Sequence, residues 1–217
     1  MSGLTSMTGA DRTQILARTR AALTRAQPPG PVVRDYRTTG DPALGSPEVV
    51  ALLTDRLVDY RAHVHPVGTE QVAAAIAGIA REHAGDAARF VVASDFGTAW
   101  RQGWLAVEDH GLSPRELDET DGAVTTCTVA IAETGTLVLD AGPGQGRRAI
   151  TLVPDLHVCL VRHDQIVQTV PEALRRLDAG RPITFISGPS ATSDIELARV
   201  EGVHGPRTLH VLLIRPP

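Results

Sequence analysis

The sequence contains few aromatic residues, little net charge and no long apolar or basic run. Phe, Tyr and Trp make up only 3 % of its 217 residues, which argues against nucleic-acid recognition by base stacking. The formal net charge is −4 and the densest basic stretch is Gly146–Arg148, so a phosphate-backbone footprint is missing. No apolar run reaches the ~20 residues that cross a bilayer. We therefore expect neither nucleic-acid binding nor a membrane span.

Cysteine is also scarce. Cys127 and Cys159 match no metal-ligand or redox-motif spacing, and we expect no metal site. An iron–sulfur cluster needs about four thiolates, so we expect none in this chain. The first residues contain no apolar segment typical of a secretion signal. With so few cysteines, this predicts a cytoplasmic location.

The apolar residues that are present, 42 % of the chain, suffice for a substantial core. Apolar runs alternate with helix-like segments, which is typical of a parallel sheet covered by helices. The connections between residues 136 and 161 are too short for crossover helices, so part of the sheet should be antiparallel. We expect strands at His63–Val67, Arg89–Ala93, Thr136–Leu139, Ala149–Val153, His157–Val161, 181–186 and 207–214. The predicted fold class is α/β: a single domain with a mixed, mainly parallel sheet flanked by helices.

An N-terminal arm is expected before this domain. A helix is predicted over residues 11–26, followed by a Pro/Gly-rich stretch without apolar periodicity. Ser46 and Pro47 are a typical N-cap and first residue of the next helix, which should reach about Ala62. Two further helices are expected, from Thr69 to near His83 and from Thr169 to Ala179. The predicted division is an arm at 1–46 and an α/β domain at 47–217.

The stretch "ISGPSATSDIE" (Ile186–Glu196) has two interpretations. Ser193 and Glu196 match a capping box, so the stretch is explained by a turn that leads into a short helix. Alternatively, Ser187, Gly188 and Ser190 follow a strand, and ligands of α/β sheets bind beyond the carboxyl ends of strands. Small residues and hydroxyls there suit a carboxylate or phosphate.

Two other polar turns have a similar composition, so we expect a shared ligand cleft. "AGPGQGRR" lacks the context of a phosphate loop and is predicted to be a hairpin loop between two strands. His157 lies in an apolar run and is predicted to be structural. The candidate ligand-binding residues are Ser94, Asp95, Thr134, Gly135, Thr136, Arg147, Ser187, Gly188, Ser190, Thr192 and His204. No catalytic residue is assigned.

Four segments, "AIAETGTLVL", "GRRAITLVPDLHVCLVRHDQIV", "ISGPSATSDIE" and "GVHGP", resemble the LUD-domain family and, within it, the lactate-utilisation C subgroup. The resemblance covers roughly Asp121–Ile214. It implies a fold related to glucosamine-6-phosphate isomerase, ribose-5-phosphate isomerase and coenzyme A transferases. Because those transferases use a glutamate near a glycine, Glu133 is the weak candidate for a nucleophile.

The resemblance also implies a function. The family is associated with bacterial oxidation of L-lactate to pyruvate, together with partner subunits that carry iron–sulfur clusters. We therefore expect a subunit without a redox centre that binds a small anionic metabolite and those partner subunits. Homo-oligomers are also compatible with the sequence. The alternatives are a stand-alone isomerase or coenzyme A transferase, or a non-catalytic regulatory protein.

Overall fold

The computed structural model of the chain describes residues 9–24, 30–192, 200–201 and 205–216. The chain forms two compact units, Met1–Tyr36 and Arg37–Pro217. In the first unit, helix α1 spans Gly9–Leu23, and residues 10–24 are exposed throughout. Its apolar side chains, which include Ile15 and Leu23, are therefore exposed as well. No helix among the described residues is long and apolar enough to cross a membrane.

The second unit is built on a six-stranded central sheet in which every pair of neighbouring strands is parallel. In spatial order the strands are β1 (His63–Gly68), β12 (Thr208–Arg215), β7 (Leu156–Arg162), β4 (Gly122–Thr126), β2 (Arg89–Ala93) and β3 (Leu105–Asp109). The prediction of a mainly parallel sheet in an α/β fold is confirmed.

The antiparallel pairing expected from the short connections lies in a second sheet of four strands. Its spatial order is β8 (Ile166–Val167), β5 (Val129–Ile131), β6 (Thr136–Leu139) and β9 (Thr184–Ile186). Strand β6 is antiparallel to both neighbours, whereas β5 and β8 are parallel. A small antiparallel pair, β10 (Ala191–Thr192) and β11 (Val200–Glu201), follows.

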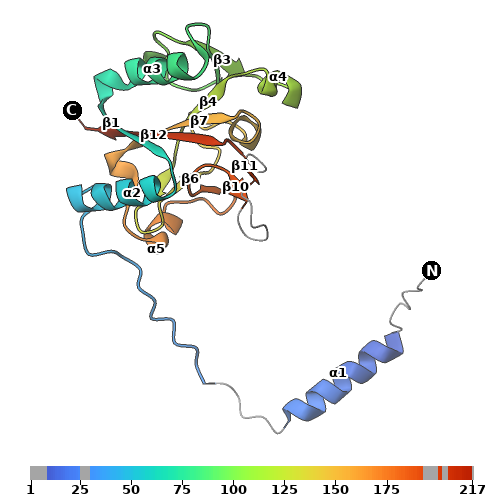
Figure 1. Cartoon of the computed structure of the whole chain (residues 1–217). Helices are drawn as coiled ribbons and strands as arrows, with labels where there is room; N and C mark the ends of the chain where they lie inside the picture. The colour runs from blue at the N-terminus through green and yellow to red at the C-terminus, as the bar shows by residue number, and fades with distance from the viewer. Residues whose placement is uncertain (1–8, 25–29, 193–199, 202–204, 217) are drawn as a thin grey trace. The chain divides into compact units, whose positions relative to one another are not determined.

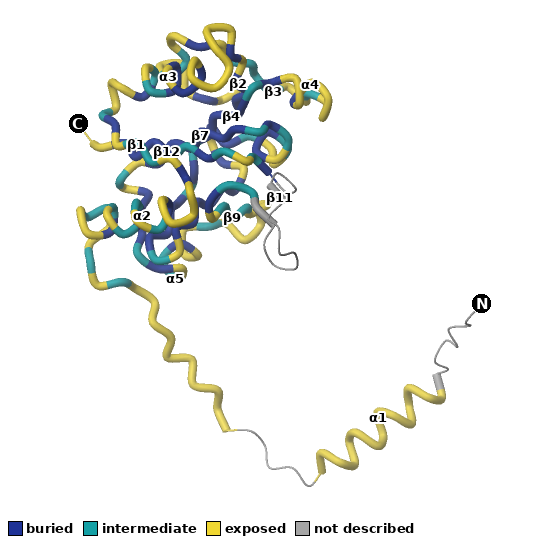
Figure 2. Tube along the Cα trace, in the orientation of Figure 1, coloured by how far each residue is buried: buried dark blue, intermediate teal, exposed yellow. Residues whose placement is uncertain are grey.

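The layers around the central sheet are helix α3 (Val72–Ala84) on one face and helix α2 (Pro47–Asp59), with the second sheet, on the other (Figure 1). Side chains of β7 alternate between the two: Leu156, Val158 and Leu160 pack with α3, whereas Cys159 and Val161 pack with α2. This is the period of two expected of a strand buried on both faces. Figure 2 shows β4 and β7, in the middle of the sheet, as buried.

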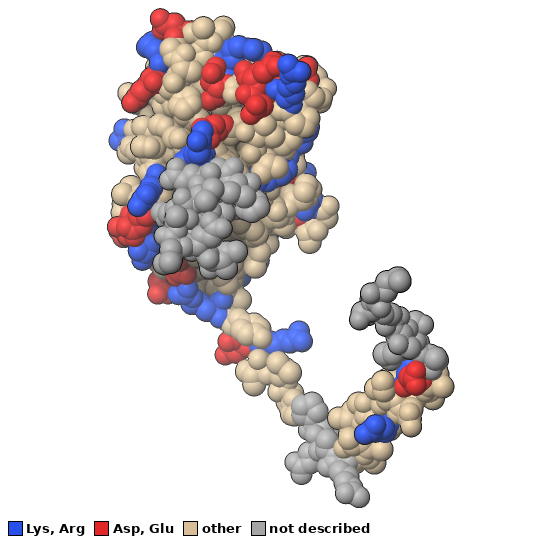
Figure 3. Space-filling model, turned by 45° about the vertical axis from the view of Figure 1, so that its right-hand side comes forward, with Lys and Arg blue, Asp and Glu red and all other residues tan. Residues whose placement is uncertain are grey.

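The outer face of the second sheet is covered by helix α5 (Val170–Leu174), through Ala173. Helix α4 (Pro114–Asp118) contributes Leu117 to a cluster beside β2 and β4. Acidic and basic side chains are interspersed over the face of the unit shown in Figure 3.

Local sequence explains where the helices begin and end. The Oγ of Ser46 accepts a hydrogen bond from the backbone N–H of Val49, and Pro47 starts α2 as predicted. Helix α2 ends at Asp59 instead of Ala62, because Arg61 has a positive φ of 65°. Thr69 begins a 3₁₀ turn, η1 (Thr69–Gln71), and α3 starts only after it.

Three predicted elements differ from the structure. Ala149–Val153 is not a strand: residues Arg148–Thr151 form a 3₁₀ helix, η3, so the loop before it is not a hairpin loop. The helix after Thr169 ends at Leu174, well before Ala179. Residues 181–186 were predicted to be a buried strand, but only Thr184–Ile186 pair, at the edge of the second sheet. Phe185 is accordingly 51 % exposed.

Candidate functional site

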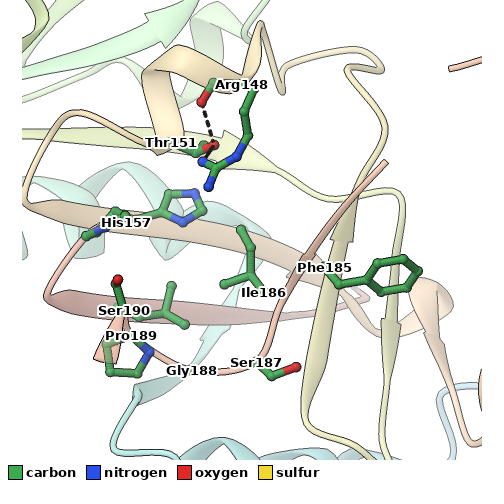
Figure 4. Close-up of a pocket in the computed structure, with 12 residues that line it drawn as sticks. Arg148, Thr151, His157, Phe185, Ile186, Ser187, Gly188, Pro189 and Ser190 are labelled. Carbon is green, nitrogen blue, oxygen red and sulfur yellow. Dashed lines mark hydrogen bonds between the residues drawn. The ribbon is translucent and has the colours of Figure 1, made fainter. Parts of the chain in front are cut away.

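A pocket of about 250 Å³ lies beside the segment Ser187–Ser190 (Figure 4). Its opposite wall is η3, which contributes Arg148 and Thr151, and its floor includes His157 and Leu209. These last two residues stand near the amino ends of β7 and β12. Gly205 and Pro206 complete the lining. The pocket therefore opens at the amino ends of the central strands and not at their carboxyl ends.

The segment Ser187–Ser190 is held in place by hydrogen bonds to two other parts of the chain. Ser187 Oγ lies 2.8 Å from Thr136 Oγ1, which in turn lies 2.7 Å from Thr134 Oγ1. The backbone N–H of Ser190 donates to the carbonyl of Pro206 over 2.8 Å. The turn at Thr134–Thr136 is thus hydrogen-bonded to Ser187, but its residues do not line the pocket, so the predicted shared cleft stays a prediction.

Gly188 is required at its position for two reasons. Its φ of +84° lies in the left-handed region, which side chains disfavour. A Cβ atom there would also lie 2.6 Å from the Cβ of Tyr60 and 3.0 Å from the carbonyl oxygen of Tyr60. The close approach to Tyr60 packs this part of the pocket wall against the end of α2.

Arg148 brings a positive charge to the pocket. Its Nη1 donates to Thr151 Oγ1 over 2.9 Å, and Figure 4 shows the guanidinium directed from η3 toward His157. Partial burial lowers the pKa of the guanidinium, but arginine stays protonated in proteins. The pocket consequently combines one cation with the hydroxyls of Ser187 and Ser190, a set suited to a small anion.

His157 is a neutral floor residue. Its side chain is buried, and its Nε2 lies 2.8 Å from Thr125 Oγ1. Burial, and secondly the charge of Arg148, lower the pKa of His157 to about 3. The imidazole is therefore uncharged near neutral pH. The hydrogen bond to Thr125 gives it the structural role that its apolar neighbours predicted.

The third predicted turn does not reach this pocket. Ser94, Asp95 and Arg147 line a different cavity, of about 340 Å³, at the carboxyl ends of β2 and β3. The physical reason is that β9, which leads into Ser187, belongs to the second sheet. Its carboxyl end is therefore not at the edge where β2 ends.

Arg147 is not the cation of the Ser187–Ser190 pocket. Its Nε and Nη2 donate to the two carboxylate oxygens of Asp109 over 2.6 and 2.9 Å. It also donates to the carbonyl of Leu112. The hydrogen bonds from Arg147 lower the pKa of Asp109. Arg147 and Asp109 therefore form an ion pair that holds the loop before η3 against the end of β3.

Glu133, the weak nucleophile candidate, is bound to Arg37, whose Nη2 lies 2.7 Å from one carboxylate oxygen. Gly135 in the same turn has a φ of +59°, and a Cβ there would lie 2.8 Å from the Cβ of Arg56. His204 and the predicted capping box at Ser193–Glu196 lie outside the described residues. Thr192 belongs to β10.

Sequence reasoning missed Arg148, Thr151, Gly205 and Pro206. Arg148 is the second arginine of "GRR", so the sequence did indicate a cation at this point of the chain. Choosing between two adjacent arginines required knowing that the second one begins η3. The prediction of a strand at Ala149–Val153 gave no reason to choose Arg148 over Arg147.

Comparison with known proteins places these residues in a family. A profile described as the LUD domain matches residues 113–214. A protein of Deinococcus radiodurans named "Lactate utilization protein C" is 45 % identical over 177 residues, which cover 79 % of this chain and 82 % of that protein. The chain belongs to the LUD-domain family. All residues that line the Ser187–Ser190 pocket fall inside the matched LUD domain.

Other relatives agree with this assignment. A "Lactate utilization protein C" of Halalkalibacterium halodurans is 33 % identical over 113 residues, which cover 47 % of this chain and 49 % of that protein. A crystal structure of a DUF162 family protein from Deinococcus radiodurans is 39 % identical and superposes with a TM-score of 0.68. The superposition covers 80 % of this chain and 99 % of that chain. The fold of this LUD-domain protein is thus shared with a solved structure.

Proposed function

We propose that this protein is a cytoplasmic subunit of a bacterial L-lactate utilisation system, and that it binds a small carboxylate- or phosphate-bearing metabolite between Arg148 and Ser187–Ser190. The role in lactate utilisation is supported by the 45 % identical relative named for it. The ligand class is supported by one observation above all: Arg148 and the serine hydroxyls line one cavity.

The proposed division of labour assigns the redox chemistry to partner subunits that carry iron–sulfur clusters. The whole chain has two cysteines, fewer than the about four thiolates that such a cluster needs. Both thiols are buried among apolar neighbours in the core between α2 and the sheets. The role of this subunit is therefore to hold a ligand and to contact the partners.

The experiment is complementation of growth on L-lactate in a strain that lacks the native copy. Arg148→Met removes the charge while keeping an unbranched side chain, and it should abolish or strongly slow growth. Arg81→Met is the matched control, because Arg81 forms an exposed ion pair with Asp86 away from this pocket. Normal growth of the strain without any copy would contradict the role in lactate utilisation.

Two further measurements separate the ligand site from the partners. Ser190→Ala should reduce growth without changing the melting temperature by more than about 1–2 °C, since it removes one hydroxyl. Unchanged growth with both Arg148→Met and Ser190→Ala would contradict the site. Purification of the tagged wild-type protein from lactate-grown cells should bring down proteins with iron–sulfur absorption, and their absence would contradict the proposed partners.

A further inference from the structure

The central sheet has a topological switch point between β2 and β4. These strands are neighbours, and the chain leaves them in opposite directions: β2 is followed by β3 on one side, and the next central strand after β4 is β7 on the other side. The connections therefore diverge beyond Ala93 and Thr126, where the two strands end. Crevices at such points are the usual ligand sites of open α/β sheets.

A cavity of about 590 Å³ lies at this switch point. It is more than twice as large as the 250 Å³ pocket beside Ser187, and it falls within the about 300–1,000 Å³ typical of small-molecule sites. Its lining includes Asp95 after β2 and Thr126–Thr128 at the end of β4. It shares none of its lining residues with the Ser187–Ser190 pocket.

The glycine-rich loop 140–147 forms one wall of this switch-point cavity. The carbonyl of Pro143 accepts a hydrogen bond from Thr126 Oγ1 over 2.6 Å, and the N–H of Gly144 donates to Asp95 Oδ1 over 3.0 Å. Gly144 has a φ of +73°, and a Cβ there would lie 3.0 Å from the Cγ2 of Thr126. The loop is thus fixed against the ends of both strands, and the wall is preformed.

The floor of the cavity holds a buried carboxylate with remaining acceptor capacity. Asp140 is 4 % exposed, and its Oδ1 accepts from Thr128 Oγ1 over 2.6 Å and from the N–H of Gly142 over 3.0 Å. Its Oδ2 lies 3.5 Å from Nη1 of Arg181, longer than a strong charged hydrogen bond. A hydroxyl group in the cavity would find an acceptor at Oδ2 of Asp140.

Three arginines stand around the same cavity: Arg162, Arg176 and Arg181. Arg162 pairs with Asp164. Arg176 donates to the backbone carbonyl of Asp164 over 3.1 Å, and no carboxylate of the described residues lies within ion-pair distance of it. Among the described residues, the guanidinium of Arg181 makes only long ion-pair contacts, 3.5 Å to Asp140 and 3.8 Å to Asp178. Arg176 and Arg181 are therefore available to bind an oxyanion in planar, multiply hydrogen-bonded geometry.

We propose that the switch-point cavity is a second ligand site, which binds a hydroxylated organic oxyanion. The phosphate or carboxylate lies against Arg176 and Arg181, and a hydroxyl donates to Asp140. Its location at the carboxyl ends of the strands separates it from the pocket that contains Arg148. The inference therefore stands independently of the function proposed for that pocket.

The test is isothermal titration calorimetry of the full-length protein with two probes, glycerol 3-phosphate and D-glycerate, which separate phosphate from carboxylate. Inorganic phosphate and glycerol serve as the fragment controls. We expect one probe to bind at least about tenfold more tightly than either fragment, since it makes both contacts at once. No detectable binding of either probe, or phosphate binding as tightly as the whole probe, would overturn the proposal.

Variants locate the binding. Arg176→Ala should weaken it about tenfold, which corresponds to the loss of one charge-assisted hydrogen bond. This residue is exposed and pairs with no described carboxylate, so the fold should tolerate the change. Asp140→Asn keeps the shape of the side chain and should weaken binding of the probe but not binding of inorganic phosphate, because it also removes a negative charge beside Arg181. Arg81→Ala is the control, and Arg148→Met should leave this affinity unchanged. Equal affinity of wild type, Arg176→Ala and Asp140→Asn would overturn the site.

Discussion

Arg37 and Glu133, 96 positions apart, form an ion pair in which Nη2 of Arg37 donates to both carboxylate oxygens over 2.7 and 2.9 Å. This ion pair connects the segment before α2, residues 37–45, to the turn between β5 and β6. Two backbone contacts continue the attachment: Asp41 N–H donates to Gln168 Oε1, and Gly45 N–H donates to the carbonyl of Ile166, both over 3.0 Å. Residues 37–45 therefore belong to the globular unit.

The first prediction concerns Glu133. Because its carboxylate is engaged by Arg37, we expect Glu133→Gln to support normal growth on L-lactate. The side chains are 63 % and 32 % exposed, so a double-mutant cycle with Arg37→Ala should give a coupling free energy of at most about 1 kcal/mol. Loss of growth with Glu133→Gln, at unchanged stability, would instead support a nucleophilic carboxylate.

The second prediction separates the arm from the domain. Deletion of residues 1–36 should leave the free energy of unfolding of the domain unchanged, because the compact unit begins at Arg37. Deletion of residues 1–45 should lower it by about 1–3 kcal/mol, since it removes the ion pair with Glu133 and the hydrogen bonds that Thr38, Asp41 and Gly45 make with the rest of the unit. Urea unfolding of both truncated proteins checks this. Equal destabilisation by the two deletions would contradict the boundary at Arg37.

The third prediction compares two glycines. Gly188→Ala should destabilise the protein by about 2 kcal/mol or more, because of the positive φ and the contact with Tyr60. Gly78→Ala is the control: Gly78 is exposed in α3, and the space that a Cβ atom would occupy there is open. It should stabilise the protein by up to about 1 kcal/mol. Thermal unfolding of both variants gives the comparison, and a destabilised Gly78→Ala would argue against this account.

The fourth prediction is a dependence of stability on pH. Burial, and then the charges of His63, His65 and His83, lower the pKa of His210 to about 4; the pKa of His157 is about 3. Unfolded histidine has a pKa of about 6.5, so between these values the unfolded state binds more protons. Stability is thus fully present above about pH 6.5 and is lost as the pH falls toward 4.

The measurement is urea unfolding at pH 5 and at pH 7. Each histidine contributes at most about 1.4 kcal/mol per pH unit to the slope, and the fully buried His157 should contribute more than the partly exposed His210. His157→Gln should reduce the slope. A slope that neither His157→Gln nor His210→Gln changes would contradict the assignment.

The fifth prediction concerns the thiols. Cys127 and Cys159 are both buried, and the hydrogen bond with Cys159, together with burial, raises the pKa of Cys127. The thiolate of Cys127 should therefore not form at neutral pH in the folded protein, and burial keeps reagents from both thiols. A thiol reagent should therefore label no cysteine in the native state and two after unfolding. Labelling of Cys127 at the rate of a free thiol would mean that the switch-point cavity admits the reagent.

Several elements could be predicted from the sequence because local signals and burial agree in them. Ser46 and Pro47 begin α2, and "RFVVA" forms β2 within its predicted bounds. Strand β3 and helix α4 were not predicted. The pattern of β3, "LAVED", ends in two acids, and its Leu105 is half exposed at the sheet edge, so it lacks the apolar run of a central strand.

The candidate site could be predicted only in part. Ser187, Gly188 and Ser190 were identified from the turn that follows a strand, and they do line a pocket. Which turns share a cavity depends on which sheet each strand joins, and that pairing involves residues far apart in the chain. The side chain of Arg148 was missed for a related reason, because the direction of an arginine depends on the 3₁₀ turn that begins with it.

The position of β12 has a consequence for synthesis of the protein. This strand lies between β1 and β7, yet its His210 is made 145 residues after the His65 that it contacts. During synthesis, β1 has no strand to pair with until residues 208–215 have left the ribosome. Such delayed, non-local pairing slows folding. A nascent chain that stalls before residue 208 exposes strand edges on both sides of the gap, and stalled chains should therefore depend on chaperones to avoid edge-to-edge aggregation.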